Sequence, residues 1–342
     1  STINAVLTII LLSSGFGVIE LIMANIAIAC AQYTITARIA TKLLPSLSIS
    51  TKFVSVTILR RVIRFSSAMF TIQIAGLVIL NTDQILLGLF VGASSITLYM
   101  VGRKLMMICN RVNNMLGSAL LPAASELEAL RHEKGIKKFV LQGGKYRCGA
   151  TLGIFVTIFV MCREIIYYWM GADYKSLTPI ARIFMSYWVL IPAIGTLGYV
   201  VRARELLKPV VGINVSIAVL NLGISLALVR PYGLLGIILG TVISYFVVYA
   251  FWIPYAVYLV GIKYSEYTKH VLIPSYTPAL LTGTLLFIIK MVIAPTNVIM
   301  ALGYVVLGLI LYYGLFYFIS MSEEERSDII RTVRGLLSPR LF

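Results

Sequence analysis

Long apolar windows constrain the fold of this chain more than any other feature. Windows of about 20 apolar residues follow one another along nearly the whole sequence. A membrane-spanning strand needs only ~10 alternating residues, so these windows indicate helices. We therefore predict an all-α, polytopic transmembrane helix bundle with about nine full spans, preceded by one partial N-terminal span from Ile3 to Leu12. The full spans are expected near 17–39, 64–90, 95–121, 147–170, 178–201, 209–229, 234–261, 271–292 and 298–319.

Composition excludes a water-soluble domain. Apolar residues make up 59% of the 342 residues, charged residues make up 12%, and the mean hydropathy is +0.94. The four cysteines have no CxxC spacing, and the two histidines lie far apart in loops, so we expect no metal ion, no other cofactor and no disulfide framework. We also find no catalytic motif and expect no enzyme.

The basic residues predict the orientation in the membrane. Arginines and lysines gather in alternate loops, and the remaining loops hold Lys175, Arg230 and Lys290. Because positive loops stay on the cytoplasmic side, we expect a multi-pass protein of the cell (cytoplasmic) membrane whose C-terminus is cytoplasmic. The net charge of +16 follows mainly from this topology, with attraction to membrane lipids as a secondary effect and no nucleic-acid partner. The basic loops include Arg60, Arg61, Arg64, Arg131, Lys134, Lys137, Lys138, Lys145, Arg147, Arg202, Arg204 and Lys208.

Both ends of the chain carry a prediction. The sequence begins at Ser1 without a signal-peptide pattern and enters apolar sequence at once, so we expect it to be the remainder of a longer protein. Near the C-terminus, Ser322 and Glu325 have the spacing of a capping box. The helix that follows is predicted to lie on the membrane surface by one apolar face, made of Ile329, Ile330, Val333, Leu336 and Leu337.

A polar stripe interrupts the window at 95–121. Its members recur at helical spacing, and a guanidinium in hydrocarbon costs at least a few kcal/mol, so the stripe should face partners, water or an anionic ligand. Arg111 lies near the middle of the window, and no acidic residue on that helix is placed to neutralise it. It suits a phosphate group, which it can bind through two parallel hydrogen bonds. Pairing with helix-end carbonyls, or with a carboxylate from elsewhere, remains an open alternative. The stripe comprises Arg103, Asn110, Arg111, Asn114 and Ser118.

An acidic residue lies at the depth of the first arginine in this stripe. Asp83 and Arg103 each lie about ten residues from the centre of the turn at 92–95, which puts both roughly 10–15 Å below the outer surface in a helical hairpin. We expect an intramembrane ion pair or a shared solvated cavity. A pair that only locks two helices together is the structural alternative. Asn81 and Gln84 would add hydrogen bonds between helices.

Four further charged residues are secondary candidates for the site. Arg163, Glu164 and Arg182 lie near the outer ends of their windows, where such residues more often anchor a helix than bind a ligand. Glu20 lies near the outer end of the first full window and is placed to titrate with a coupling proton, although a lone interfacial glutamate is usually solvated.

Several blocks of sequence resemble the polysaccharide and O-antigen flippases of the multidrug/oligosaccharidyl-lipid/polysaccharide exporter superfamily. The strongest runs from Asn81 to Gly92 (NTDQILLGLFVG) and continues as LYMVGRKL at 98–105 and LLPAASEL at 120–127. Supporting blocks are EIIYYWMGADY at 164–174, the stretch 214–221, PYGLLG at 231–236, and Gly240 with Thr241. The resemblance covers nearly the whole chain.

The resemblance implies a fold of two pseudo-symmetric helical lobes. Residues 1–40 would be the last two helices of the first lobe, the first of them partial, and 41–63 a cytoplasmic connector. Residues 64–261 would form the six-helix second lobe, 262–320 two additional helices, and 321–342 a cytoplasmic amphipathic tail. Because alternating access needs both lobes, transport by these residues alone would be unexpected.

The implied cargo is a polyprenyl-diphosphate-linked oligosaccharide that crosses the membrane for surface polysaccharide biosynthesis. Arg103 and Arg111 would hold the diphosphate, Asn110 and Asn114 would bind sugar, and Asp83 would position Arg103. The sequence leaves open whether H⁺ or Na⁺ is coupled to transport, and other polysaccharide-assembly proteins are candidate partners. Alternatives are an ion-coupled drug or cation exporter, which should expose acidic residues in its cavity, and a membrane-embedded glycan polymerase or transferase, which needs convergent acid and base groups.

Overall fold

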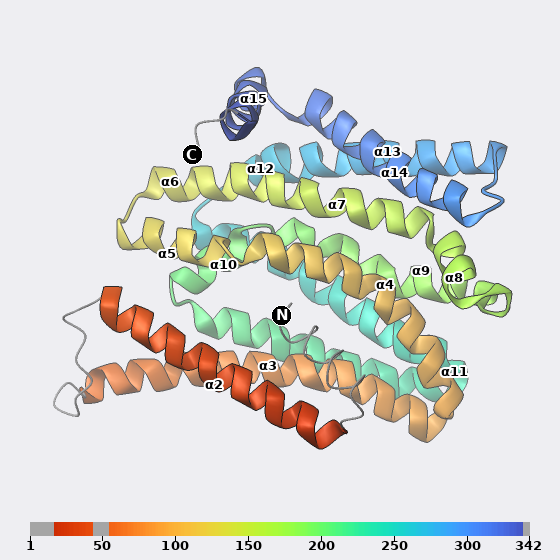
Figure 1. Cartoon of the computed structure of the whole chain (residues 1–342), viewed down its shortest axis with the longest axis horizontal. Helices are drawn as coiled ribbons and strands as arrows, with labels where there is room; N and C mark the ends of the chain where they lie inside the picture. The colour runs from red at the N-terminus through yellow and green to blue at the C-terminus, as the bar shows by residue number, and fades with distance from the viewer. Residues whose placement is uncertain (1–16, 44–54, 338–342) are drawn as a thin grey trace. The chain divides into compact units, whose positions relative to one another are not determined.

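The computed structural model describes residues 17–43 and 55–337, which are mostly helical, with short turns between the helices, and contain no strand (Figure 1). This confirms the predicted all-α polytopic bundle. The α-helices are α2 (Val18–Leu43), α3 (Val56–Phe90), α4 (Ala93–Gly117), α5 (Leu120–Ala129), α6 (Glu133–Lys138), α7 (Gly144–Val160), α8 (Cys162–Met170), α9 (Thr178–Ser186), α10 (Leu197–Ala203), α11 (Leu207–Val260), α12 (Tyr264–Tyr267), α13 (Ile273–Val292), α14 (Val298–Leu315) and α15 (Glu323–Leu337). Short 3₁₀ and π segments, η2 to η7, join several of them.

The chain divides into two units, Ser1–Val62 and Ile63–Phe342. Within the first unit, the structure describes α2 and the beginning of α3. Glu20 lies in the first turn of α2 and Lys42 in its last turn, the placement that complements the helix dipole. The expected partial span Ile3–Leu12 and most of the expected connector lie outside the described residues. All the contacts discussed below, except those of Glu20, belong to the second unit.

Six described helices are long and apolar enough to cross a membrane, and the bent pair Glu133–Val160 and Cys162–Met170 would make a seventh. The protein is therefore a multi-pass membrane protein, and the count of nine spans stays a prediction. Two features account for the difference between the nine expected spans and the six or seven found among the described helices. One helix of 54 residues, α11, covers two expected windows, and α4 carries three charged residues, Arg103, Lys104 and Arg111.

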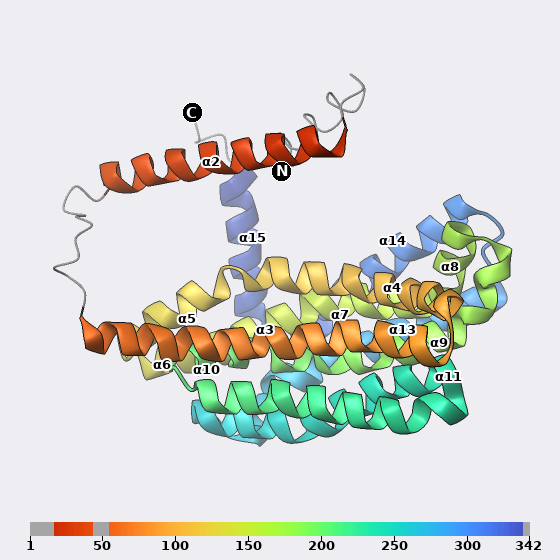
Figure 2. The ribbon, with the colours of Figure 1, turned by 90° about the horizontal axis from the view of Figure 1, so that it is seen from below.

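α11 is a helical hairpin, because its chain reverses at Gly233, which has φ 54° and ψ −127°. Figure 2 shows the two halves running side by side. Asn221 on the first half donates a hydrogen bond of 2.9 Å to Thr241 on the second. A Cβ at Gly236 would lie 2.1 Å from the Leu228 carbonyl oxygen, so the two backbones are in contact there. The Gly236-xxx-Gly240 motif thus joins the two halves of one hairpin.

Two other expected spans are broken. α7 and α8 meet at an angle of 66° at Met161. The window at 178–201 is divided among α9, the 3₁₀ segments η4 (Tyr187–Leu190) and η5 (Pro192–Ile194), and α10. Pro192 lacks a backbone N–H, and Gly195 takes a positive φ of 50°, which together explain why this helix does not continue.

α7 lies at the centre of the second unit and packs against α4, α13 and α14. Gly149 and Gly153, one turn apart, form a slot for aromatic rings. A Cβ at either position would lie within 2.5 Å of the Phe316 or Tyr312 ring. Tyr312 is fully buried, and its hydroxyl donates to the Ser275 carbonyl at 3.1 Å. The two glycines of α7 therefore leave room for these rings, which lets α14 and α13 pack closely against α7.

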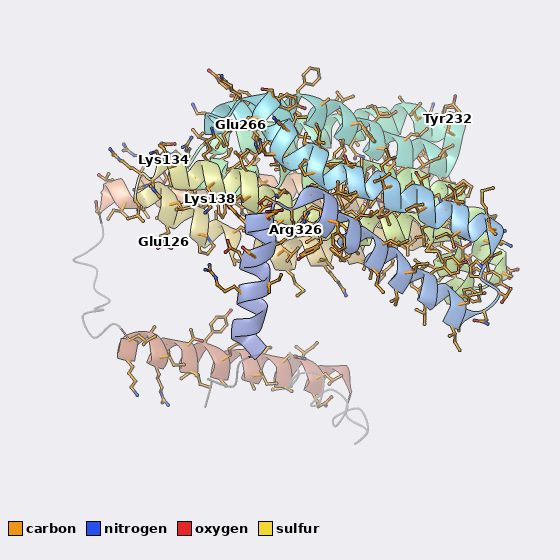
Figure 3. The ribbon with its side chains drawn as sticks, turned by 90° about the horizontal axis from the view of Figure 1, so that it is seen from above. Glu126, Lys134, Lys138, Tyr232, Glu266 and Arg326 are labelled. Atoms are coloured by element: carbon orange, nitrogen blue, oxygen red, sulfur yellow. The ribbon has the colours of Figure 1, made fainter. Side chains whose placement is uncertain are left out.

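The C-terminal helix α15 has the predicted capping box. The Glu325 amide donates to Ser322 Oγ at 3.3 Å, and the Ser322 amide donates to Glu325 Oε2 at 2.8 Å. The same Oε2 atom pairs with Lys145 Nζ on α7 at 2.6 Å. Arg326 lies where α15 leaves the bundle (Figure 3) and donates to the Tyr317 carbonyl at 3.0 Å. Ile330 is exposed, and the other side chains of the predicted apolar face lie outside the described residues.

Substitution at Gly236 tests the hairpin contact. Gly236→Ala places a methyl group against the backbone of Leu228, so we expect a loss of about 1–3 kcal/mol in unfolding free energy. Gly223→Ala on the same hairpin is the control, because no atom lies within 4 Å of its Cβ position. Unfolding in mixed detergent micelles would measure both variants. Equal stability of the two variants would show that the halves do not touch as described.

Acidification should release α15. Burial would raise the pKa of Glu325, but hydrogen bonds from Lys145 and from the Ser322 amide outweigh it, and the net pKa lies below its usual value of 4.5. The stabilisation is therefore complete above pH 4.5 and is lost as the pH falls through the lowered pKa. A spin label on Ser327→Cys should gain mobility only below that pH, whereas Glu325→Gln should be mobile at pH 7. If the label is equally mobile at pH 7 and below pH 4.5 in the protein that keeps Glu325, the docking of α15 onto Lys145 is refuted.

Candidate functional site

The structure divides the predicted stripe on α4. Asn110 is half-buried and accepts a hydrogen bond of 2.8 Å from Trp188 Nε1, which belongs to η4. Arg103 is also half-buried, and its guanidinium contacts Met100 Sδ at 3.9 Å. Arg111 and Asn114 are exposed, and neither side chain has a hydrogen-bond or ion-pair partner in the described part of the chain. Part of the stripe therefore packs into the bundle, and its deeper part faces outward from it.

Asp83 is fully buried where α3, α4 and α11 meet. Its carboxylate accepts hydrogen bonds from the Tyr99 and Thr241 hydroxyls, each at 2.9 Å, and from Asn221 Nδ2 at 3.4 Å. Tyr99 lies four residues before Arg103, on the turn of α4 that packs against α3. Two helices, α4 and α11, thus supply donors to one carboxylate on α3.

The expected ion pair between Asp83 and Arg103 is wrong. Across residues 17–43 and 55–337, no arginine, lysine or histidine lies within 4.0 Å of the Asp83 carboxylate. The distances of Asp83 and Arg103 from the turn in sequence do not fix the direction of a side chain around its helix. Tyr99 occupies the position facing Asp83, so Asp83 cannot be assigned to hold Arg103. Asn81, two residues earlier on α3, is exposed.

The secondary candidates stabilise the break between α7 and α8. Glu164 pairs with Lys290 of α13 at 3.1 Å, and Lys290 also donates to the Val160 carbonyl at 2.8 Å. Arg182 donates to the same carbonyl at 3.2 Å and to the Phe159 carbonyl at 3.3 Å. Both cations thus satisfy carbonyls at the C-terminal end of α7. These contacts favour the structural role for Glu164 and Arg182.

The two remaining secondary candidates are exposed. Arg163 lies on the outer side of α8. Glu20 belongs to the first unit, where its carboxylate accepts a hydrogen bond of 2.9 Å from the Gly17 amide at the start of α2. This contact caps a helix, and nothing in it indicates a ligand.

Two arginines that the sequence assigned to basic loops have specific partners. Arg204 donates to Glu128 at 3.0 Å and to Glu133 at 3.1 Å, and it also donates to the Leu259 and Val260 carbonyls near the end of α11. Arg147 is buried, donates to the Gly195 carbonyl, and lies 5.2 Å from the centre of the Tyr199 ring. The partners are 48 to 76 residues away in sequence, so no local spacing pattern predicts these contacts.

The charged loops gather at one end of the second unit. Figure 3 shows Glu126, Lys134, Lys138 and Glu266 at this end and Tyr232 at the opposite end. Lys137 pairs with Glu266 at 2.8 Å, which connects α6 to α12. The separation agrees with the loop asymmetry from which the orientation was predicted.

An apolar cavity of about 990 Å³ lies between α7, α11 and α13. Its lining includes Phe155, Ile253, Tyr276, Leu280 and Phe287. None of the predicted site residues lines it. An apolar lining of this kind accommodates hydrocarbon and excludes a diphosphate group.

Energetic coupling tests the corrected pairing. Asp83→Ala leaves two hydroxyls and an amide without their buried acceptor, so we expect it to cost about 2–4 kcal/mol of unfolding free energy. Arg103→Ala should cost less, and the double variant should be additive within about 0.5 kcal/mol. The measurement is a double-mutant cycle by unfolding in detergent. A coupling energy above about 1 kcal/mol would restore the ion pair.

Comparison with known proteins identifies the family of this chain. A family model described as polysaccharide biosynthesis protein matches residues 1–179, which include α2, α3, α4 and the exposed polar face of α4. No curated protein and no solved structure matches the chain. Because the model covers more than half of the 342 residues, the chain belongs to the polysaccharide biosynthesis protein family.

Proposed function

We propose that this protein is a flippase that moves a polyprenyl-diphosphate-linked oligosaccharide across the cytoplasmic membrane for surface polysaccharide biosynthesis. The family supports a role in polysaccharide biosynthesis, and the multi-pass helical architecture supports transport. Cargo of this class has to cross hydrocarbon with its diphosphate and sugars shielded. Its anionic part therefore needs a cationic group at membrane depth.

Arg111 is the observation that carries the proposal. It lies inside the 25-residue helix α4, is exposed on the second unit, and has no hydrogen-bond or ion-pair partner within the described ranges. An arginine at this position is costly in hydrocarbon unless water or an anion reaches it. Its planar guanidinium matches the oxygens of a diphosphate. Asn114 is exposed one turn further along the same helix and is placed to bind sugar.

The other members of the predicted site take different roles in this proposal. Arg103 is half-buried on α4 and would add positive charge two turns away from Arg111. Asn110 already accepts a hydrogen bond from Trp188, which leaves its amide hydrogens for a ligand. Asn81 remains an exposed candidate on α3. We do not assign Asp83 to the substrate site, because its carboxylate is buried and accepts hydrogen bonds from three residues.

The charge pattern separates this function from the alternatives. A drug or cation exporter would present a carboxylate to its cargo, whereas Asp83 is 0% exposed. A polymerase or transferase would need acid and base groups that converge beside a substrate, and the buried acid Glu164 is paired with Lys290. In the proposed orientation the charged-loop end and the C-terminus lie in the cytoplasm, as the excess of basic loops indicates.

Flipping of a lipid-diphosphate oligosaccharide by the full-length protein in vesicles tests the proposal. Arg111→Ala should reduce the initial rate by about 10- to 100-fold, because a charge-assisted bidentate contact is worth about 1.5–3 kcal/mol. Arg111→Lys should retain part of the activity as a point charge. Arg230→Ala, at an exposed position near the hairpin turn, is the matched control and should flip at the normal rate. Unchanged flipping by a correctly inserted Arg111→Ala variant would refute the assigned role.

A further inference from the structure

Two arginines at the charged-loop end of the second unit lack a counter-charge. Arg147 lies in the first turn of α7 and is 8% exposed, and Arg202 lies in the last turn of α10 and is half-buried. The Nε atom of each guanidinium is buried without a hydrogen-bond partner in the described residues. Neither guanidinium forms an ion pair with a carboxylate of residues 17–43 or 55–337. Such unpaired cations are costly to bury.

Tyr199 brings the two arginines together. The Arg147 guanidinium lies 5.2 Å from the centre of the Tyr199 ring and donates to the Gly195 carbonyl just before α10. Arg202 follows Tyr199 by three residues on α10, so the two side chains are neighbours on that helix. The two guanidinium charges repel each other, and both act on the Tyr249 hydroxyl of α11. Three helices thus bring two cations and two hydroxyl groups into one cluster.

The buried face of α4 closes this cluster on another side. A Cβ at Gly117 would overlap the Tyr199 hydroxyl, so Tyr199 lies directly against the backbone of α4. Asn113 is one turn earlier on the same face and is 6% exposed. Its side-chain oxygen has no hydrogen-bond partner in the part of the chain that the structure describes. The two ends of an asparagine amide are assigned from their neighbours, so this side chain is able to present donors here as well.

A phosphate group matches these donors. Arg147 binds the Gly195 carbonyl through Nη1, which leaves the opposite edge of its guanidinium, formed by Nε and Nη2, for another acceptor. Two parallel N–H groups on that edge fit two oxygens of a phosphate. A phosphate group carries roughly −1.5 to −2 charge at pH 7, which balances two guanidinium ions. A halide or a carboxylate has a single negative charge and would leave one cation uncompensated.

We propose that Arg147 and Arg202, together with Tyr199 and Tyr249, form a binding site for a phosphate group. The site lies within the bundle, apart from the exposed face of α4 that carries Arg111. The phosphate comes from solution as the free ion or belongs to the headgroup of a lipid. Tyr249 also lines the apolar cavity between α7, α11 and α13, so such a lipid has room for its hydrocarbon chain beside the site.

Thermal unfolding of the purified full chain in detergent tests the site. Millimolar sodium phosphate should raise the midpoint by a few degrees and saturate, whereas NaCl at equal ionic strength should not. Arg202→Gln should fold as well as the parent, because Arg202 has no ion-pair partner within the described ranges, and should lose the shift. Arg147→Gln should also lose it. Lys208→Gln, which removes an exposed cation at the start of α11, is the matched control and should keep the shift.

Phosphatidic acid in the micelles distinguishes the two sources of the phosphate group. If the free ion is the ligand, inorganic phosphate alone produces the shift that depends on Arg202. If a lipid supplies the group, micelles doped with phosphatidic acid produce this shift and inorganic phosphate does not. Phosphatidylglycerol should produce a smaller shift, because its phosphate is a diester with a single negative charge.

Three results would overturn the site. If neither inorganic phosphate nor phosphatidic acid produces a shift that depends on Arg202, no phosphate group binds there. If NaCl produces the same shift, salt only screens the repulsion between the two arginines. A shift that rises without saturation and persists in both Arg202→Gln and Arg147→Gln would reflect the general exclusion of phosphate from protein surfaces. The site does not rest on the proposed function, because binding is measured without cargo.

Discussion

Satisfaction of polar groups inside hydrocarbon is the constraint on which this structure depends. Within a bilayer, a buried donor, acceptor or charge cannot form hydrogen bonds with water, so it needs a partner within the protein. The Asp83 carboxylate meets this requirement through Tyr99, Asn221 and Thr241, which ties α3, α4 and α11 together. Gly236 and Gly240 permit the close backbone approach that puts two of those partners within reach.

The same constraint explains the irregular helices. The break between α7 and α8 exposes backbone carbonyls, and Arg182 and Lys290 supply donors to them. At the charged-loop end, Arg204 binds carbonyls near the end of α11 and two glutamates at the same time. Against this background Arg111 is an exception, since it lies within α4 and has no hydrogen-bond or ion-pair partner among the described residues. We attribute this exception to function.

The fold was predictable from sequence to a large extent, because each membrane helix is recognisable from a continuous window of apolar residues. Hydropathy located the apolar windows, and the spacing of Ser322 and Glu325 gave the capping box. Hydropathy does not show where a helix breaks or reverses. Gly233 turns α11 into a hairpin, and Pro192 with Gly195 interrupts another window, yet both lie in stretches that remain apolar throughout.

The site was less predictable, because partners across a bundle are distant in sequence. The distances of Asp83 and Arg103 from the turn at 92–95 do not determine the rotation of each helix, so they could not show which side chains face each other. The true partners of Asp83 lie 16, 138 and 158 residues away. One local signal was available: Asn221 and Ser225 are one turn apart and precede a glycine motif that ends beside Thr241, a pattern that places several oxygen atoms on one face.

Accessibility of the exposed face of α4 tests the central claim most directly. Cys109, Cys148 and Cys162 are buried, so Cys30→Ser leaves a background of low reactivity for an introduced thiol at Asn114→Cys. If α4 lines an aqueous passage for anionic cargo, a water-soluble thiol reagent should label this position in membranes, and a polyprenyl diphosphate oligosaccharide should protect it. An unlabelled position that reacts only with lipid-soluble reagents would show that this face meets lipid, which would contradict the account.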